Sequence, residues 1–250
     1  MTEPSKGERT AQRIMDAAEV VFAAKGYEAA SLRAVAARVG IRQPGLYNHF
    51  ASKEALYRAV LHRGLQPMAD LMEVILREPV GRGEMRSLAG RITDLLTRHP
   101  NIPGLLVQGM QASGHQGAEI ALDWLAHLML LGRRVNKAAG AARTSHELLL
   151  LQLALFNLCC GYFWGAPLVA RLTGRSVLDR KLLATQKRLI ERISDDLVSR
   201  HGARAGARRA AARPAIRATA GTRTPDRRTR YRTGRQPGPV PPRRYRRARS

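Results

Sequence analysis

The chain has 250 residues, enough for one or two compact domains, and its hydrophobic fraction of 44% is ordinary for a soluble globular protein. The two cysteines, Cys159 and Cys160, are adjacent, and neighbouring cysteines seldom form a disulfide because the ring would be strained. The first ten residues, MTEPSKGERT, contain no apolar run, which excludes a signal peptide there. We therefore expect a reduced, cytoplasmic protein.

The formal charge of +24 is unevenly distributed. Residues 204–250 contain 16 arginines and one acidic residue, whereas residues 1–203 contain 27 basic and 18 acidic residues, a net charge of about +9. The first part is thus basic enough for a polyanionic partner. The segment 203–250 has almost no large apolar residues, so we expect a disordered Arg/Pro-rich tail. Non-specific affinity for nucleic acid and a read-through origin are both compatible with that tail.

The N-terminal quarter predicts four helices in succession. Apolar residues at helical spacing indicate a helix over residues 8–25, which Gly26 should end. Ser31 is a candidate N-cap for a short second helix that Gly40 ends, and Pro44 suits the first turn of a third. Ser52 is a candidate cap for a fourth helix that runs to about residue 77, with a kink or break expected near residue 66 because Gly64 and Pro67 lie inside it.

The remaining chain also has helical patterns, over residues 84–99, 102–112, 118–139, 144–166 and 177–200. Thr144 with Glu147 forms a capping-box pattern before a very apolar segment, and Ser176 with Asp179 repeats that pattern before the last helix. No alternation of period two with turn signals occurs, so the sequence predicts an all-α fold.

Residues 31–50 have the spacing of a helix-turn-helix motif, in which a second helix enters the major groove of DNA. Leu46 and Phe50 would face the core and leave the polar side chains of the third helix outward. Only such outward residues can reach base edges or phosphates. The candidate DNA-binding residues are Ser31, Arg33, Arg42, Gln43, Pro44, Gly45, Tyr47, Asn48, His49 and Lys53.

Residues 8–60 resemble the N-terminal domain of TetR-type transcriptional regulators, through the segments FAAKGYEAAS, LRAVAARVG and LYNHFASKEAL. By position, the resemblance implies base-reading or groove-edge roles for the residues Arg33, Gln43, Pro44 and Gly45. It implies phosphate contacts for Tyr47, His49 and Lys53. Asn48 falls at a variable position of the family, and Arg42 stays open between phosphate and guanine.

The resemblance also implies an organisation for the whole chain. A DNA-binding domain at 8–68 would be followed by a helical regulatory and dimerisation domain at 69–202 and the tail at 203–250. The helices near 144–166 and 177–200 would form the interface of a homodimer. A small effector would then release this repressor from a near-palindromic double-stranded operator.

Large or soft residues on the central helices are candidates for the effector pocket: Leu106, Met110, Trp124, Leu128, Phe156, Cys160, Phe163 and Trp164. Their apolar character indicates a hydrophobic effector. Asp123 and His127 are spaced at i and i+4 but lack a third ligand, so we expect no metal and no cofactor. No catalytic motif occurs, and an enzyme is not expected.

Two alternatives remain at this stage. An activator or a ligand-insensitive regulator could use the same scaffold, and the sequence does not distinguish them from a repressor. A membrane-associated helical protein is the alternative from another class, because residues 148–169 are long and apolar enough to cross a bilayer. Gln152, Asn157, Gly165 and Pro167 within that segment favour burial between subunits over a membrane span.

Overall fold

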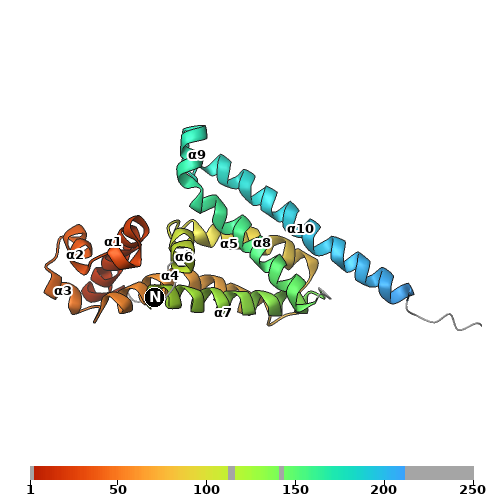
Figure 1. The fold of residues 1–250 in the computed structure, drawn as a ribbon, viewed down its shortest axis with the longest axis horizontal. Helices are drawn as coiled ribbons and strands as arrows, with labels where there is room; N and C mark the ends of the chain where they lie inside the picture. Colours follow the sequence, from red (N-terminus) through yellow and green to blue (C-terminus); the bar gives the residue numbers. More distant parts are fainter. Residues whose placement is uncertain (1–2, 112–115, 141–143, 212–250) are drawn as a thin grey trace, which may run out of the picture. The chain divides into compact units, whose positions relative to one another are not determined.

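A computed structural model of the chain describes residues 3–111, 116–140 and 144–211, and every regular element in these ranges is an α-helix (Figure 1). The all-α prediction is therefore confirmed. The helices are α1 (Lys6–Ala29), α2 (Leu32–Val39), α3 (Gln43–Tyr47), α4 (Lys53–Ile75), α5 (Arg82–Leu96), α6 (Ile102–Gln111), α7 (Gln116–Ala138), α8 (Ser145–Trp164), α9 (Ala166–Thr173) and α10 (Arg180–Ala211).

Local signals place the ends of the first helices where the sequence predicts them. Gly26 adopts φ 74° and interrupts the helical geometry of α1 near its end. The Ser31 hydroxyl accepts the Ala34 N–H at the start of α2, and the Ser52 hydroxyl accepts the Ala55 N–H at the start of α4. Each cap satisfies an amide that the first turn of a helix leaves without a partner. Helices α1 to α4 bury a common core that includes Ile14, Phe22 and Leu46.

Helix α4 is continuous from Lys53 to Ile75, so of the predicted kink or break near residue 66 the break is wrong. Gly64 is required by packing, since a Cβ there would lie 2.5 Å from Cγ1 of Ile102 on α6. Pro67 lies between buried neighbours, and the packing of α4 against α6 and α7 maintains the helix through it. Tertiary contacts here outweigh the local preference of proline.

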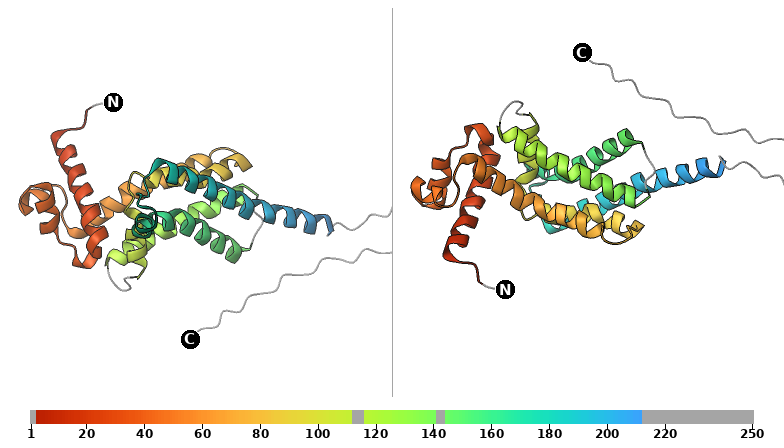
Figure 2. Two further views of the ribbon diagram at one scale, coloured as in Figure 1. Left: turned by 90° about the horizontal axis from the view of Figure 1, so that it is seen from above. Right: turned by 90° about the horizontal axis from the view of Figure 1, so that it is seen from below.

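Helices α4 to α8 form the second part of the fold, with α4 and α7 lying side by side (Figures 1 and 2). Helix α6 packs between α1 and α7 and also contacts α8, so it connects the N-terminal helices to the rest. The predicted boundary at residue 68 falls inside α4, which both parts share. The division into 8–68 and 69–202 therefore stays a prediction.

The C-terminal helices differ from the predictions in three respects. The capping box of Thr144 and Glu147 is confirmed at α8, but a separate short helix, α9, follows it and was not predicted. At α10 the cap is Asp179 alone, whose carboxylate accepts the N–H groups of Lys181 and Leu182. Helix α10 continues to Ala211, past Gly202, so the segment 203–211 is not part of an unstructured tail. The rest of the predicted tail lies outside the described residues.

Candidate nucleic-acid interface and regulatory cavity

The turn between α2 and α3 has a defined hydrogen-bond geometry. Gly40 adopts φ 77° and ψ 31°, and its N–H donates to the Ala37 carbonyl at 3.2 Å. The Ile41 N–H donates to the Ala36 carbonyl at 3.0 Å. This pair of bonds is a Schellman motif, which satisfies the last carbonyls of α2 and fixes the direction in which the chain leaves it. The orientation of α3 against α2 is thereby set by the backbone.

Helix α3 buries Leu46 completely, and Phe50 packs partly buried against the same core, as predicted. Its opposite face is accessible: Pro44 and Asn48 are exposed, and Tyr47 is 48% exposed. Gln43 and His49 are half-buried, and the Gln43 amide lies 3.5 Å from the Tyr47 hydroxyl. The structure thus brings the predicted α3 residues onto one accessible surface, which we call the α3 surface.

Lys53 is held within the chain. Its ammonium group donates to the carbonyl oxygens of Glu28 at 3.1 Å and Ala30 at 3.3 Å, and it lies 4.5 Å from the ring centroid of Tyr27. These contacts fix the start of α4 to the end of α1. A structural role accounts for the position of Lys53, and a phosphate contact through its remaining N–H stays a prediction.

Three arginines near the helix-turn-helix are exposed and form no ion pair within the described residues: Arg33 and Arg38 on α2, and Arg42 before α3. Arg33 and Arg42 were predicted as candidates, whereas Arg38 was not. Its position in the last turn of α2, beside the turn to α3, is the sequence signal that could have identified it. Ser31, another candidate, is exposed but engaged as the N-cap of α2.

A buried carboxylate links the N-terminal helices to the second part of the fold. Glu19 of α1 is 5% exposed, and its oxygens contact Arg63 of α4 at 3.0 Å, His99 at 2.9 Å and Asn101 at 3.3 Å. Burial acts to raise the pKa of Glu19, but the hydrogen bond and charge of His99, the charge of Arg63 and the Asn101 hydrogen bond outweigh it. The net pKa is lowered, so this carboxylate is ionised at neutral pH.

A second link lies at the other end of the same interface. The Gln108 amide on α6 donates to the Ala23 carbonyl of α1 at 3.0 Å. Gly117, near the start of α7, is so close to the Tyr27 ring that a Cβ there would overlap it. The Tyr27 ring in turn packs 4.9 Å from the ring of Tyr57 on α4. A displacement of α6 or α7 would therefore be transmitted to α1.

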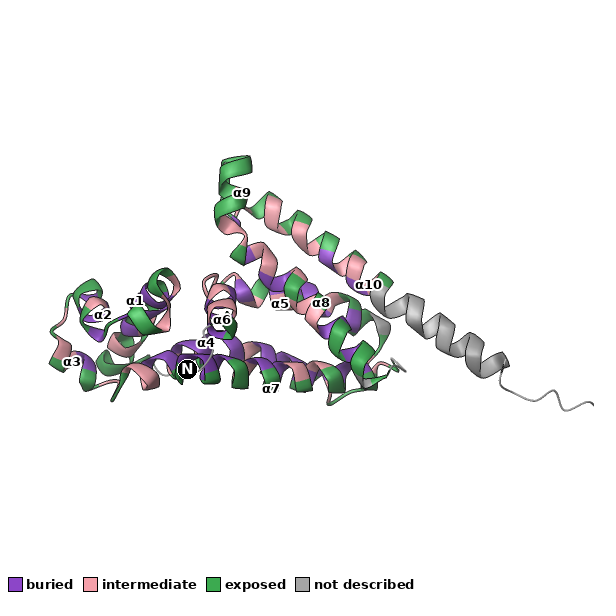
Figure 3. Cartoon of the chain, in the orientation of Figure 1, coloured by how far each residue is buried: buried purple, intermediate pink, exposed green. Residues whose placement is uncertain are grey.

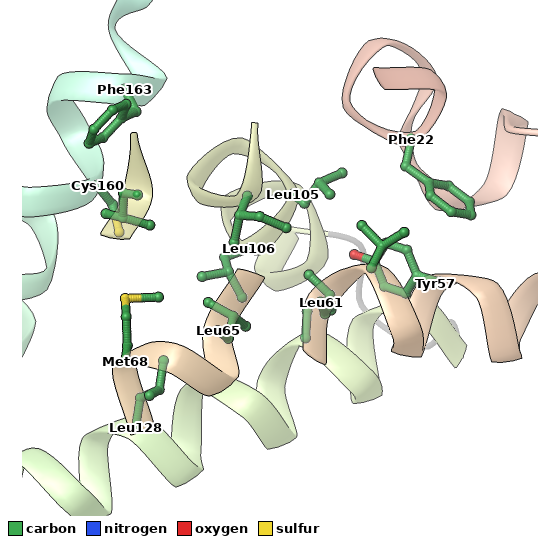
Figure 4. Close-up of a cluster of buried hydrophobic side chains, with 14 of the residues drawn as sticks. Phe22, Tyr57, Leu61, Leu65, Met68, Leu105, Leu106, Leu128, Cys160 and Phe163 are labelled. Carbon is green, nitrogen blue, oxygen red and sulfur yellow. The ribbon is translucent and has the colours of Figure 1, made fainter. Parts of the chain in front are cut away.

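A cavity of about 100 Å³ lies between α4, α5, α6, α7, α8 and α10. Four of the eight predicted pocket residues line it: Leu106, Leu128, Phe156 and Cys160. Figure 4 shows three of these, with Met68, around the buried cluster. The sequence missed most of the wall, namely Met68, Met72, Met85, Leu88, Ala89, Ile92, Met129, Gly132, Asn136, Gln152, Leu155, Cys159 and Ser194. Most of them are apolar residues at helical spacing, a pattern that is typical of a core and gives no sign of a void.

The other four predicted pocket residues lie elsewhere. Met110 and Trp164 are exposed, by 38% and 62% of their surface. Trp124 packs edge-on between the rings of His62 and His127, and Phe163 is buried against Tyr162. A large apolar side chain on a central helix has several possible surroundings, and these four do not line the cavity.

Within the described ranges, no group of three potential metal ligands occurs. One described helix segment, His146–Trp164, has the length and composition of a membrane span, with a mean hydropathy of 1.4. Only 33% of it is buried within the chain. Exposed apolar side chains also occur on α9, so one copy of the chain leaves this apolar surface uncovered.

An exposed α3 behind a Schellman turn, carried on an otherwise helical chain, defines the class of helix-turn-helix DNA-binding proteins. Residues 14–60 match the family described as bacterial regulatory proteins, tetR family. The HTH-type transcriptional activator FasR of Mycolicibacterium smegmatis is 40% identical over 72 residues, 29% of this chain and 32% of that protein. An uncharacterised HTH-type regulator of Bacillus subtilis, YobS, is 32% identical over 91 residues, 36% of this chain and 48% of that one.

The matched stretches thus span less than half the length of these relatives. The similarity in fold extends further: the regulator FadR of Bacillus subtilis, solved with stearoyl-CoA, aligns with 72% of this chain and 96% of its own, with a TM-score of 0.52 and 16% identity. The N-terminal part of the chain is thus similar to tetR-family regulators over residues 14–60, and the described helices share the fold of such a regulator.

Proposed function

We propose that the chain is a homodimeric transcriptional repressor, released from a near-palindromic DNA operator when a small hydrophobic molecule fills the cavity behind α4. The observation that carries this proposal is the α3 surface, because its direction is fixed by backbone hydrogen bonds and its polar side chains are accessible. A short helix presented in this way fits the major groove.

The residue roles within this proposal follow from position and exposure. Gln43, Pro44 and Gly45 lie in the first turn of α3, which is the part of a recognition helix that contacts base edges. Gln43 can bond an adenine, and Pro44 offers an apolar contact to a thymine methyl group. Tyr47, His49 and Lys53 contact phosphates, which position the protein without reading sequence, and Arg42 stays open between a phosphate and a guanine. Arg33 reaches a base or a phosphate from α2, and Asn48 is left without an assigned role.

Dimerisation through α8 and α10 is supported by apolar surface that one copy leaves uncovered. Leu150 of α8 is 66% exposed, and Leu168 and Leu172 of α9 are 60% and 75% exposed. Helix α9 as a whole is mostly exposed in one copy of the chain (Figure 3). Leu189 adds an exposed apolar side chain on α10. A second copy covering this surface would place two α3 helices about 34–36 Å apart, on successive turns of the major groove.

Release by a ligand requires a connection between the cavity and α3, and two links supply it. Met68 and Met72 of α4 line the cavity, and the same helix carries Arg63, which bonds Glu19 of α1. Leu106 of α6 lines the cavity two residues from Gln108, which bonds Ala23. A ligand that moves α4 or α6 would therefore tilt the N-terminal helices and disturb the spacing of the two α3 helices.

The alternative on this scaffold is an activator, which one relative, FasR, is named as being. A repressor and an activator would make the same contacts in the major groove, so DNA binding is tested first. DNA fragments are selected from a random pool with the full chain, and binding of the selected fragment is measured against salt. We expect two similar half-sites about ten base pairs apart and an affinity that falls steeply with salt.

Failure to enrich any sequence above a shuffled control contradicts the proposal. Transcription from the selected site, with and without the protein, then distinguishes a repressor from an activator. Recovery of the protein from the membrane pellet after salt and carbonate washing would instead favour the membrane-associated alternative.

A further inference from the structure

The wall of the cavity carries no charged side chain among its described residues. It is built from leucine, isoleucine, alanine and phenylalanine, with four methionines: Met68, Met72, Met85 and Met129. Burial raises the pKa of Cys159 to about 12 and raises that of Cys160 above its ordinary value, so both thiols stay protonated and neutral. An apolar, uncharged wall favours a ligand of the same character.

Two polar atoms in this wall are buried without a hydrogen-bond partner, the Oδ1 atom of Asn136 and the Oγ atom of Ser194. Asn136 is 4% exposed and Ser194 is 3% exposed. The Asn136 Nδ2 donates to the Gly132 carbonyl at 2.9 Å, which fixes the amide orientation and leaves Oδ1 as a free acceptor. A buried polar group without a partner is unfavourable, so a ligand that supplies the partner gains affinity.

A third polar side chain in the wall is already satisfied. The Gln152 amide donates to the Met129 carbonyl at 2.7 Å, and a Cβ on Gly132 would lie 2.9 Å from the same nitrogen. Gln152 therefore ties α8 to α7 beside the cavity. The polar atoms of the wall that lack a hydrogen-bond partner belong to Asn136 on α7 and Ser194 on α10.

The size of the cavity limits the ligand. A volume of about 100 Å³ is somewhat below the roughly 150 Å³ of an engineered cavity that holds benzene. The unbranched methionine side chains are adaptable and can move aside for a slightly larger molecule. A single substituted ring or a chain of similar volume therefore fits only once these methionine side chains have moved aside.

We infer that this cavity binds a neutral, mainly apolar molecule about the size of a substituted benzene, whose single O–H or N–H donor bonds the Asn136 side-chain oxygen. The Ser194 hydroxyl, the other unpartnered polar atom of the wall, is available to donate to an oxygen or nitrogen of the ligand. The inference names the ligand class of the cavity that the proposed function uses. It rests on the proposed function only for the claim that the ligand controls DNA binding. An organic anion is excluded, because its charge would be buried without a counter-charge in the wall.

The test uses three molecules with the same methylphenyl body and measures their binding to the full chain, without DNA, by titration calorimetry. The compound 4-methylphenol has a donor, 4-methylanisole has an acceptor only, and 4-methylbenzoate carries a negative charge. We expect 4-methylphenol to bind about tenfold more tightly than 4-methylanisole, the effect of one buried hydrogen bond. We expect no detectable binding of 4-methylbenzoate.

Two variants locate the site. Asn136→Leu keeps the approximate volume and removes the acceptor, so the tenfold preference for 4-methylphenol should vanish while 4-methylanisole binds at least as well as before. Ser194→Ala should weaken both neutral compounds and preserve the preference between them. A preference unchanged in Asn136→Leu, tight binding of the benzoate, or no binding of any compound to the wild-type chain overturns the inference. The wild-type comparison stands even if a variant fails to fold.

These outcomes are separable from those of the proposed function. If 4-methylphenol binds with the expected preference but no DNA sequence is enriched, the inferred ligand class is supported and the proposed regulatory function is contradicted. If an operator is found and the protein is released from it only by anionic compounds, the regulatory function is supported and the inferred ligand class is wrong.

Discussion

At the scale of residues, the two glycines on either side of the helix-turn-helix connection have different tasks. Gly40 occupies the left-handed region at φ 77°, whereas Gly45 lies within α3 with ordinary helical geometry. Neither has an atom within 4 Å of the position of an added Cβ. Steric crowding is therefore the same at both, and the backbone conformation alone distinguishes them.

Gly40→Ala should lower the free energy of unfolding by about 1–2 kcal/mol, because an L-residue is strained at this φ. Gly45→Ala should leave that free energy unchanged or raise it by up to about 1 kcal/mol, since alanine favours a helix over glycine. Gly45→Ala should nevertheless weaken operator binding if the backbone of α3 approaches DNA closely. Urea denaturation and fluorescence anisotropy measure the two effects, and equal stability of both variants would contradict the assignment.

Gln43 and Tyr47 should separate the reading of sequence from the contact with phosphate. Gln43→Ala should change which base pair is preferred at one position of each half-site, by about 1–3 kcal/mol. Tyr47→Phe should weaken binding to all sequences by a similar factor and leave the preference intact. Selection from a random pool with each variant provides the comparison. An unchanged preference in Gln43→Ala would remove this residue from the base-reading set.

At the scale of elements, the Glu19 cluster is the contact through which α1, α4 and the start of α6 are held together. It combines a buried carboxylate with a guanidinium, an imidazole and an amide from three separate segments. Because the carboxylate is ionised and well hydrogen-bonded, removal of its charge alone should be costly. The exposed Asp16, which contacts the same Arg63 at 2.6 Å, provides an internal comparison.

Glu19→Gln should lower the free energy of unfolding by about 2 kcal/mol at pH 7, the range for hydrogen bonds to a charged group. The pKa of Glu19 in the folded chain lies below its ordinary value of 4.5, so the stabilisation is present above about pH 4.5 and is lost as the pH falls through the folded pKa. The difference between the variant and the wild type should accordingly shrink in acid.

Asp16→Asn is the matched control and should change stability by less than about 1 kcal/mol, because exposed ion pairs contribute little. Denaturation curves at pH 7 and below pH 4.5 check both variants. A Glu19→Gln effect that is no larger than that of Asp16→Asn would show that the cluster does not hold the helices together.

At the scale of the whole molecule, the uncovered apolar side chains of α8, α9 and α10 are the feature that one copy of the chain does not explain. Leu150→Arg and Leu172→Arg should each convert the dimer to a monomer, because a charge would be buried without a partner in the interface. Leu130→Arg, on a side chain of α7 that is also 60% exposed, is the control and should leave the dimer intact.

Analytical ultracentrifugation measures the outcome. The monomeric variants should also bind the operator far more weakly, since a dimer contacts two half-sites at once. Dimerisation that survives both interface substitutions would show that these helices are covered in another way.

The sequence by itself determined the helical class, the helix-turn-helix and most helix ends, because these depend on residues close together in the chain. Gly40, Ser31 and the Thr144–Glu147 capping box act on their own neighbours, so their effects are readable without a fold. The wrong predictions, a break in α4 and a last helix ending before residue 203, are cases in which local preference for proline or glycine did not decide the conformation.

Only the tertiary structure decided what lies between the helices. Gly64 lies against Ile102, where a Cβ would not fit. Glu19 is buried among partners about 45 to 80 residues away in the chain. The same holds for the cavity, since Asn136 and Ser194 look like ordinary polar residues in the sequence. Whether a polar atom is satisfied depends on side chains distant in the chain, and their proximity is set by packing rather than by local pattern.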